Sequence, residues 1–202
     1  MKTCILITGI PASGKSTLSR QLGQRLNLPV ISKDDIKERL FDDIGFASRA
    51  EKVQLGVTAM HLMYDMAHRL MQCGQTFLLE NNFENASRAE LDALLREYGY
   101  QALTITLTGD YRVIYQRFVE RDRSAGRHRG HVVNDCYPEK EPGRMVQPLS
   151  FEAFVRGIAA RGMDTFAAGE RLTVHVTDWN CVDPDAIVQW ILSKEEHVGD
   201  GV

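Results

Sequence analysis

Short apolar runs alternate along the chain with longer stretches in which apolar residues recur every three or four positions. The first pattern is typical of buried β-strands and the second of amphipathic helices. The runs predict strands at residues 3–8, 29–32, 76–79, 102–107 and 172–176. The longer stretches predict helices at residues 16–26, 34–41, 48–72, 87–98 and 111–121, and from residues 150 and 184 onward. Strands and helices in alternation predict an α/β fold with a parallel sheet.

Two segments carry the Ser-x-x-Glu pattern of a capping box, in which both side chains bond free backbone N–H groups in the first turn of a helix. Ser48 and Glu51 are predicted to open the longest helix, and Ser87 and Glu90 the helix after it. The stripe of the longest helix that is predicted to face the core comprises Val53, Val57, Met60, Tyr64, Ala67 and Leu70.

Residues 122–147 show neither pattern. A connector of this length without secondary structure is uncommon in a compact domain and is usually a functional lid or an insertion. We therefore expect one domain, residues 1–202, with a mobile lid at about residues 122–147. The polar tail from Glu195 is predicted to fray.

The composition is ordinary for a globular chain and narrows the classes of partner. The net charge of −3 argues against a surface that binds nucleic acid throughout, so any basic site has to be local. The four cysteines lie far apart and form no C-x-x-C pair, which favours free thiols in a reducing compartment. Without a recognisable signal peptide or a membrane-spanning apolar stretch, we expect a cytoplasmic protein with no membrane partner.

The junction between the first predicted strand and the first predicted helix carries the most specific motif. Its sequence GIPASGKS, residues 9–16, fits the phosphate-loop pattern G-x-x-x-x-G-K-[ST] at every fixed position. In that pattern backbone N–H groups surround a phosphate, the lysine reaches the terminal phosphates, and the hydroxyl binds Mg²⁺. The alternative is a simple Gly/Ser turn. The predicted nucleotide site comprises Gly9, Ile10, Pro11, Ala12, Ser13, Gly14, Lys15, Ser16 and Thr17, with Ser16 as the metal ligand.

Polar residues also follow the second and third predicted strands, where ligands bind in parallel α/β sheets. Asp34 and Asp35 follow the second strand. Asp34 is closer to the strand and is our candidate for the base that accepts the proton of a substrate hydroxyl. Alternatively, this acidic pair caps the next helix and favours its dipole. Glu80 is a candidate to lie near Mg²⁺ or substrate, or else a buried structural acid, and Asn82 either binds substrate or shapes the turn.

Six arginines lie between residues 112 and 129. Phosphoryl transfer needs cations on the phosphates in the transition state, and the planar fork of arginine suits this role. Arg117 and Arg121 lie one helical turn apart on one face and are our candidates. The alternative is a solvated charged face, because Glu120 and Asp122 are interleaved with them.

The motifs GIPASGKST, ISKDDIKE, FLLENNFE and IYQRFVERD together resemble the small P-loop kinases related to polynucleotide 5′-hydroxyl kinase, zeta toxin and chloramphenicol phosphotransferase, an AAA-type ATP-binding group. This resemblance covers most of the chain. It implies a P-loop three-layer sandwich around a five-stranded parallel sheet, with the phosphate-loop strand in the middle. It also implies ATP and Mg²⁺ as cofactors, Asp34 as the base, Lys15 and Arg121 on the γ-phosphate, and adenine near Thr177 and Asp178.

This chain departs from the resembled kinases at two positions. Polynucleotide kinases commonly have a substrate-binding arginine after the acidic pair, whereas this chain has Lys37 with Arg39 close by. Glu80 stands where Asp is commoner. Both departures weaken the interpretation that the substrate is a nucleic acid, without affecting the interpretation that the protein is a kinase. The substrate-binding candidates are Asp34, Asp35, Lys37, Arg39, Glu80 and Asn82.

The sequence therefore predicts a kinase that transfers the γ-phosphate of ATP to a hydroxyl, with Lys15, Asp34 and Arg121 as catalytic residues. The acceptor is a small molecule or, less favoured because of the net charge, a nucleic-acid end. The alternative function is an NTP-hydrolysing switch without a small-molecule acceptor. We expect a monomer or a homodimer.

Overall fold

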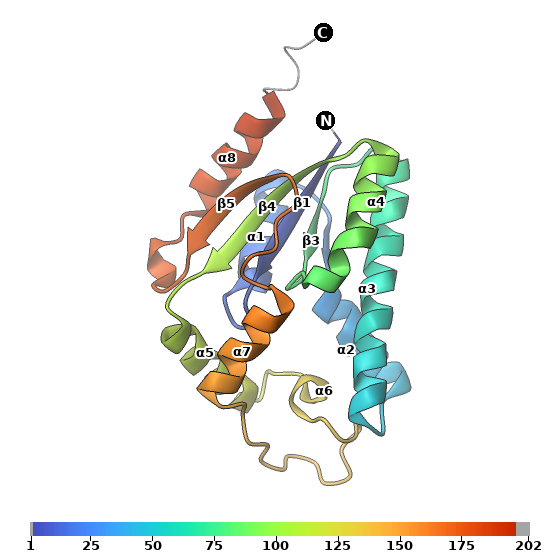
Figure 1. The fold of residues 1–202 in the computed structure, drawn as a ribbon, viewed down its shortest axis with the longest axis vertical. Coiled ribbons are helices and arrows are strands. Elements are labelled where there is room, and N and C mark those ends of the chain that lie inside the picture. Colours follow the sequence, from blue (N-terminus) through green and yellow to red (C-terminus); the bar gives the residue numbers. More distant parts are fainter. Residues whose placement is uncertain (1, 197–202) are drawn as a thin grey trace.

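The computed structural model describes residues 2–196, and within them five strands form a single parallel sheet (Figure 1). The strands are β1 (Thr3–Gly9), β2 (Val30–Ser32), β3 (Phe77–Glu80), β4 (Gln101–Thr108) and β5 (Glu170–His175). They lie in the order β2-β3-β1-β4-β5, and every neighbouring pair is parallel. The α/β fold is confirmed, with the strand before the phosphate loop at the centre of the sheet.

Helices connect the strands and cover both faces of the sheet (Figure 1). They are α1 (Lys15–Leu26), α2 (Lys33–Ile44), α3 (Arg49–Gln72), α4 (Arg88–Tyr98), α5 (Tyr111–Arg123), α6 (Arg129–Val132), α7 (Phe151–Arg161) and α8 (Pro184–Glu196). Single 3₁₀ turns lie at Asn85–Ser87 and Trp179–Cys181. The tail that we expected to fray from Glu195 is helical as far as Glu196, and the rest of it lies outside the described residues.

The central strand β1 shows why the molecule has three layers. All seven of its residues are buried, because helices cover the strand on both sides. Cys4 and Leu6 pack in the cluster that contains α3 and α4. Ile5 and Ile7 point the other way, into the cluster that contains α1 and α8. In residues 2–196 no helix combines the length and the apolar character that crossing a membrane requires.

The two predicted capping boxes have different outcomes. Ser48 Oγ accepts a hydrogen bond from the Glu51 backbone N–H at 3.2 Å, and Glu51 Oε2 accepts one from the Ala47 N–H at 2.7 Å. The capping box at Ser87 is wrong, because the 3₁₀ turn before it already gives Ser87 helical backbone angles. Its hydroxyl donates instead to Met60 Sδ on α3, at 3.2 Å.

The buried stripe of α3 also differs from the prediction. Val53 is 52% exposed, whereas Lys52 is only 4% exposed and Leu55 is buried. The reason is that the first half of α3 packs against α2 and the 122–147 segment rather than against the sheet. There Leu55 joins a small apolar cluster with Phe41 and other side chains. Farther along, Tyr64 and Ala67 face the sheet as predicted.

Gly169 provides a test of how closely β5 approaches β4. It has a φ of +64°, and a Cβ added to it would overlap the carbonyl group of Ala102. Gly99 has the same φ of +64° but open space around it. Gly169→Ala should lower the free energy of unfolding by about 3 kcal/mol, and Gly99→Ala by only about 1 kcal/mol, because the second change meets backbone strain without a clash. Urea unfolding of both variants measures the difference, and equal losses would contradict the role of the close approach.

Candidate active site

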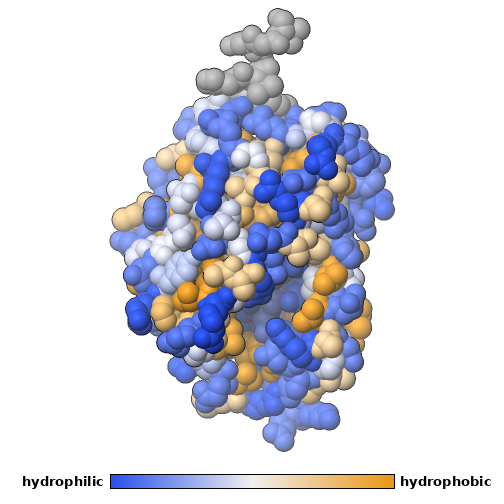
Figure 2. Space-filling view, in the orientation of Figure 1, coloured by the Kyte–Doolittle hydropathy of each residue, from blue (hydrophilic) through white to orange (hydrophobic). Residues whose placement is uncertain are grey.

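A cavity of about 450 Å³ lies beyond the carboxyl ends of β1, β2 and β3. Its wall includes residues from the phosphate loop, α2, α3, α5, α7 and the 122–147 segment. Figure 2 shows a hollow near the middle of the face in view, with mostly hydrophilic side chains around it. The predicted site residues that line the cavity are Pro11, Ala12, Gly14, Lys15, Ser16, Thr17, Asp34, Lys37, Glu80, Asn82, Arg117 and Arg121.

The phosphate loop surrounds the ammonium group of Lys15. Its Nζ donates to the carbonyl oxygens of Gly9 at 3.0 Å and Ile10 at 2.9 Å. Burial lowers the pKa of Lys15 to about 8, against the opposing effect of two nearby carboxylates. Ser13 Oγ is buried in the same loop without a hydrogen-bond partner within the described chain. The loop thus holds a buried cation and an unsatisfied hydroxyl, as expected of a site for an anionic ligand.

Trp179 closes one side of the phosphate loop. Gly14 has a φ of +91°, and a Cβ there would overlap the indole ring. Glycine is therefore needed both for the turn and for the close approach of the ring. Together with Arg117, the ring lines a smaller recess of about 240 Å³ beside the loop. The sequence prediction missed Trp179, although its position just after the last strand was a usable signal.

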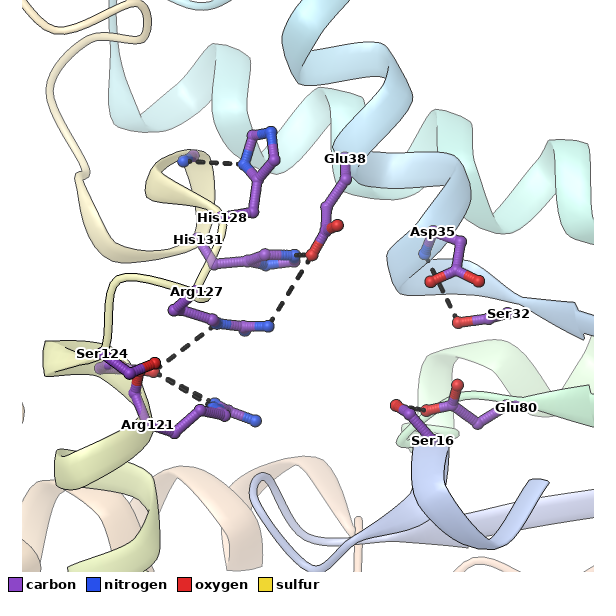
Figure 3. Close-up of polar contacts among 12 residues, drawn as sticks. Ser16, Ser32, Asp35, Glu38, Glu80, Arg121, Ser124, Arg127, His128 and His131 are labelled. Atoms are coloured by element: carbon purple, nitrogen blue, oxygen red, sulfur yellow. Dashed lines mark hydrogen bonds and ion pairs between the residues drawn. The ribbon is translucent and has the colours of Figure 1, made fainter. Parts of the chain in front are cut away.

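Ser16 and Glu80 form an oxygen-rich pair at the bottom of the cavity. Ser16 is the second residue of α1, and its Oγ donates to Glu80 Oε1 at 3.1 Å (Figure 3). Glu80 ends β3 and is 4% exposed. Burial raises the pKa of Glu80, and the charge of Lys15 opposes that rise. Hydroxyl and carboxylate oxygens are the ligands that Mg²⁺ prefers, so this pair fits such an ion.

Asp34 and Asp35 have separate environments. Neither caps α2: Ser32 does, because its Oγ accepts from the Asp35 backbone N–H at 3.4 Å (Figure 3). Asp34 lines the cavity, whereas Asp35 does not. Burial alone would raise the pKa of Asp34, but the positive charges around it, His131 and Arg127 first, lower the pKa below its ordinary value. Asp34 is therefore ionised at neutral pH.

Lys37 and Arg39 also lie in different environments. Lys37 lines the cavity, one turn after Asp34 on α2. Arg39 points to solvent, where its side chain is 76% exposed and its Nε lies 2.7 Å from Asp43 Oδ2. Arg39 therefore does not belong to the cavity wall.

The arginines of α5 and the following segment have distinct partners. Arg117 donates to the carbonyl oxygens of Val176 at 2.5 Å and Thr177 at 2.7 Å, which joins α5 to the loop after β5. Arg121 and Arg127 flank Asp122, at 3.3 and 3.7 Å. In Figure 3 both arginines point toward the side of the site where Ser16 and Glu80 lie.

Thr177 and Asp178 support the recess without lining it. Thr177 Oγ1 accepts a hydrogen bond from the Asp110 N–H at 2.8 Å. Asp178 Oδ1 accepts from the Asn180 N–H at 3.0 Å and so caps the 3₁₀ turn that carries Trp179. Their contact with a nucleotide base stays a prediction.

Lys52 anchors the 122–147 segment to α3. Its buried Nζ donates to the carbonyl oxygens of His131 at 2.8 Å and Val133 at 2.5 Å, and to Asn134 Oδ1 at 3.1 Å. Arg49 donates to the same Asn134 oxygen at 2.6 Å. Lys52, Arg49 and Arg161 line the cavity but were not predicted. They come from helices remote in sequence and belong to no motif, so the sequence offered no signal for them.

Comparison with known proteins agrees with this geometry. A family model described as an AAA domain matches residues 4–135. No curated protein matches the chain. A candidate kinase from Chloroflexus aurantiacus j-10-fl has a similar structure, with a TM-score of 0.75 and 27% identity over 99% of this chain and 97% of its own.

Two further solved structures share the fold. Shikimate kinase from Bacteroides thetaiotaomicron has a TM-score of 0.53 at 17% identity, over 96% of this chain and 98% of its own. APS kinase from Mycobacterium tuberculosis, solved in complex with AMPPNP and APS, has a TM-score of 0.54 at 16% identity, over 96% and 97%. The chain thus has the fold of P-loop kinases.

The buried ammonium of Lys52 predicts a pH-dependent stability. Burial lowers its pKa from 10.5 to about 7. Between these values the unfolded chain holds a proton that the folded protein releases, so the free energy of unfolding rises with pH. The destabilising contribution is complete below pH 7 and is relieved above it. Relative to Lys52→Met, wild type should gain about 1 kcal/mol per pH unit between about pH 7.5 and 9.

Urea unfolding of the two proteins across this pH range measures the gain. Lys140→Met is the matched control, because Lys140 lies exposed in the same segment. Its stability should follow that of wild type at each pH. Parallel pH profiles for wild type and Lys52→Met would contradict the prediction.

Proposed function

The chain belongs to the AAA domain family, whose model matches residues 4–135. On this basis we propose that the protein is an ATP-dependent kinase that phosphorylates a hydroxyl group. One observation carries the proposal. A single cavity holds the phosphate-loop ammonium of Lys15, the Ser16–Glu80 oxygen pair, and the ionised carboxylate of Asp34. A protein that only binds a nucleotide does not need the carboxylate of Asp34. Within the kinases, the motifs support the group related to polynucleotide kinase, zeta toxin and chloramphenicol phosphotransferase.

The phosphate-loop side of the cavity binds the nucleotide. Lys15 and the backbone N–H groups at the start of α1 hold the terminal phosphates. The recess between Arg117 and Trp179 takes the adenine ring. Ser16 and Glu80 are the residues that would hold Mg²⁺, which supplies positive charge to the phosphates when bound.

Asp34 contacts the hydroxyl group of the acceptor. Its lowered pKa keeps the carboxylate ready to accept the proton of the attacking hydroxyl and to orient that hydroxyl toward the phosphate. Arg121 and Arg127 supply positive charge from the opposite side of the nucleotide phosphates. An NTP-hydrolysing switch would use Asp34 only to orient a water molecule and would not need the cation-lined space beside Asp34, so we prefer the kinase.

Two substitutions test the proposal by separating nucleotide binding from phosphate transfer. Lys15→Ala should weaken both, because Lys15 contacts the phosphates before and during transfer. Asp34→Asn should leave nucleotide affinity within about threefold and lower transfer by about 10²–10⁴, the usual contribution of a positioned base. Asp35→Asn is the matched control, since Asp35 neighbours Asp34 but does not line the cavity.

Titration calorimetry with Mg–AMPPNP measures the affinity, and single-turnover transfer from labelled ATP to a panel of sugars, polyols, hydroxy acids, nucleosides and 5′-hydroxyl oligonucleotides measures the chemistry. If Asp34→Asn transfers at the wild-type rate, Asp34 is not the base. If it abolishes nucleotide binding, the carboxylate belongs to the nucleotide side. ATP hydrolysis that no acceptor stimulates would favour the switch.

We further propose that residues 122–147 form a lid that moves together with α2 and α3. His131 Nε2 lies 2.9 Å from Glu38 Oε1 on α2, and Lys52 on α3 bonds the same segment. Mg–AMPPNP should therefore slow hydrogen exchange in residues 122–147, because Arg121 and Arg127 gain phosphate partners. Exchange in α4, which lies away from the cavity, serves as the control. Strong protection of the segment that nucleotide leaves unchanged would exclude a closing lid.

A further inference from the structure

The cavity is strongly positive although the whole chain is not. The sequence has 24 lysines and arginines against 27 acidic residues, yet eight lysines and arginines line the cavity against three carboxylates. Part of this excess serves a nucleotide, since Lys15, Arg117 and Arg121 lie on the phosphate-loop and α5 side and Arg127 points toward that side from the lid. The remaining four cations come from α2, α3 and α7, on the side where the acceptor has to enter.

These remaining cations differ in the partners that the protein itself provides. Arg161 lies 3.1 Å from the carboxylate of Glu84. Lys52 pairs with no carboxylate among residues 2–196, but three neutral oxygens accept hydrogen bonds from its ammonium. These two cations therefore have local roles in the protein.

Lys37 and Arg49 lack such partners. Among residues 2–196 the Lys37 ammonium makes no hydrogen bond or ion pair. Its Nζ lies 5.4 Å from the centre of the Phe41 ring and close to Gly56. Arg49 donates to the neutral amide oxygen of Asn134, and it pairs with no carboxylate among residues 2–196. Burial lowers the pKa of Lys37, the nearby carboxylate of Asp34 opposes this effect, and the charges of Lys33 and Arg49 add to it. With Asp34 as the nearby carboxylate, two cations at one cavity wall still leave a net positive charge, which favours an anionic ligand.

We propose that Lys37 and Arg49 bind an anionic group of the acceptor, a phosphate or a carboxylate, while Asp34 contacts its hydroxyl. This inference rests on the proposed kinase function and names its substrate class. Asp34 and Lys37 are three residues apart on α2, which places their Cβ atoms about 5–6 Å apart. The acceptor is therefore a compact molecule whose hydroxyl and anionic group are separated by a few bonds, such as a small hydroxy acid or a sugar phosphate.

Direct anion binding tests the subsite without any catalysis. Inorganic sulfate is titrated into wild type saturated with Mg–AMPPNP, and into nucleotide-free Lys15→Ala protein, whose phosphate loop no longer competes. In both, adding Lys37→Met or Arg49→Gln should weaken sulfate binding at least tenfold, and Lys37→Arg should retain it within about threefold. Arg69→Gln, an exposed arginine near the other end of α3, should change it less than twofold. Unchanged sulfate binding in Lys37→Met protein that unfolds at the wild-type temperature would overturn the subsite.

Matched acceptors test the substrate class. Glycerol, glyceric acid and glycerol phosphate share a hydroxyl-bearing carbon chain and differ in charge, and a 5′-hydroxyl oligonucleotide offers the same phosphate chemistry in a polymer. The kinase should favour the small anionic compounds at least tenfold in kcat/KM, and Lys37→Met should remove this preference through KM. Equal use of glycerol, or a preference for the oligonucleotide over both small anions, would overturn the proposal. If neither these compounds nor any acceptor of the wider panel is phosphorylated or stimulates ATP hydrolysis, the kinase function fails, while the sulfate titration still decides the anion subsite.

Discussion

The ammonium group of Lys15 is buried where the central strand ends, and the rest of the site is arranged around that charge. Two carbonyl oxygens of its own loop hold it, and Glu80 and Asp34 provide the nearby negative charge. A buried cation is costly unless such groups surround it. The strand order meets this need, because β3 lies directly beside β1 and β2 directly beside β3. The residues that follow three parallel strands thus converge on one cation.

The same charge pattern divides the cavity into two sides. The phosphate loop, α5 and the turn that carries Trp179 form the side suited to a nucleotide. Helices α2 and α3 and the 122–147 segment form the other side. The segment has little apolar content of its own and depends on α3 for its position, through the hydrogen bonds of Lys52 and the apolar cluster that Val133 joins with Leu55. In the proposed reaction, nucleotide and acceptor meet between two parts of the cavity wall that are each internally connected.

Local patterns predicted the fold well where a local cause decides the structure. Buried apolar runs predicted every strand to within about two residues, and Ser48 and Ser150 cap their helices as such residues usually do. The prediction failed where neighbours in space decide. Ser87 donates to Met60 instead of capping α4, and α3 buries Lys52 instead of Val53, because contacts with residues far away in the sequence determine where these side chains lie.

The candidate site divides in the same way. The sequence by itself determined the phosphate loop, since its glycines, lysine and serine are neighbours whose spacing alone sets their geometry, and it placed Asp34 and Glu80 at strand ends. The sequence favoured Asp34 over Asp35 as the residue closer to the strand. Only the tertiary structure decided that Asp34 and Lys37 line the cavity while Asp35 and Arg39 do not, because that depends on how α2 is rotated against its neighbours. It alone brought Arg49, Lys52 and Arg161 to the same wall. Charges on separate helices act on one ligand only after packing brings them within a few ångströms, and no sequence spacing encodes that distance.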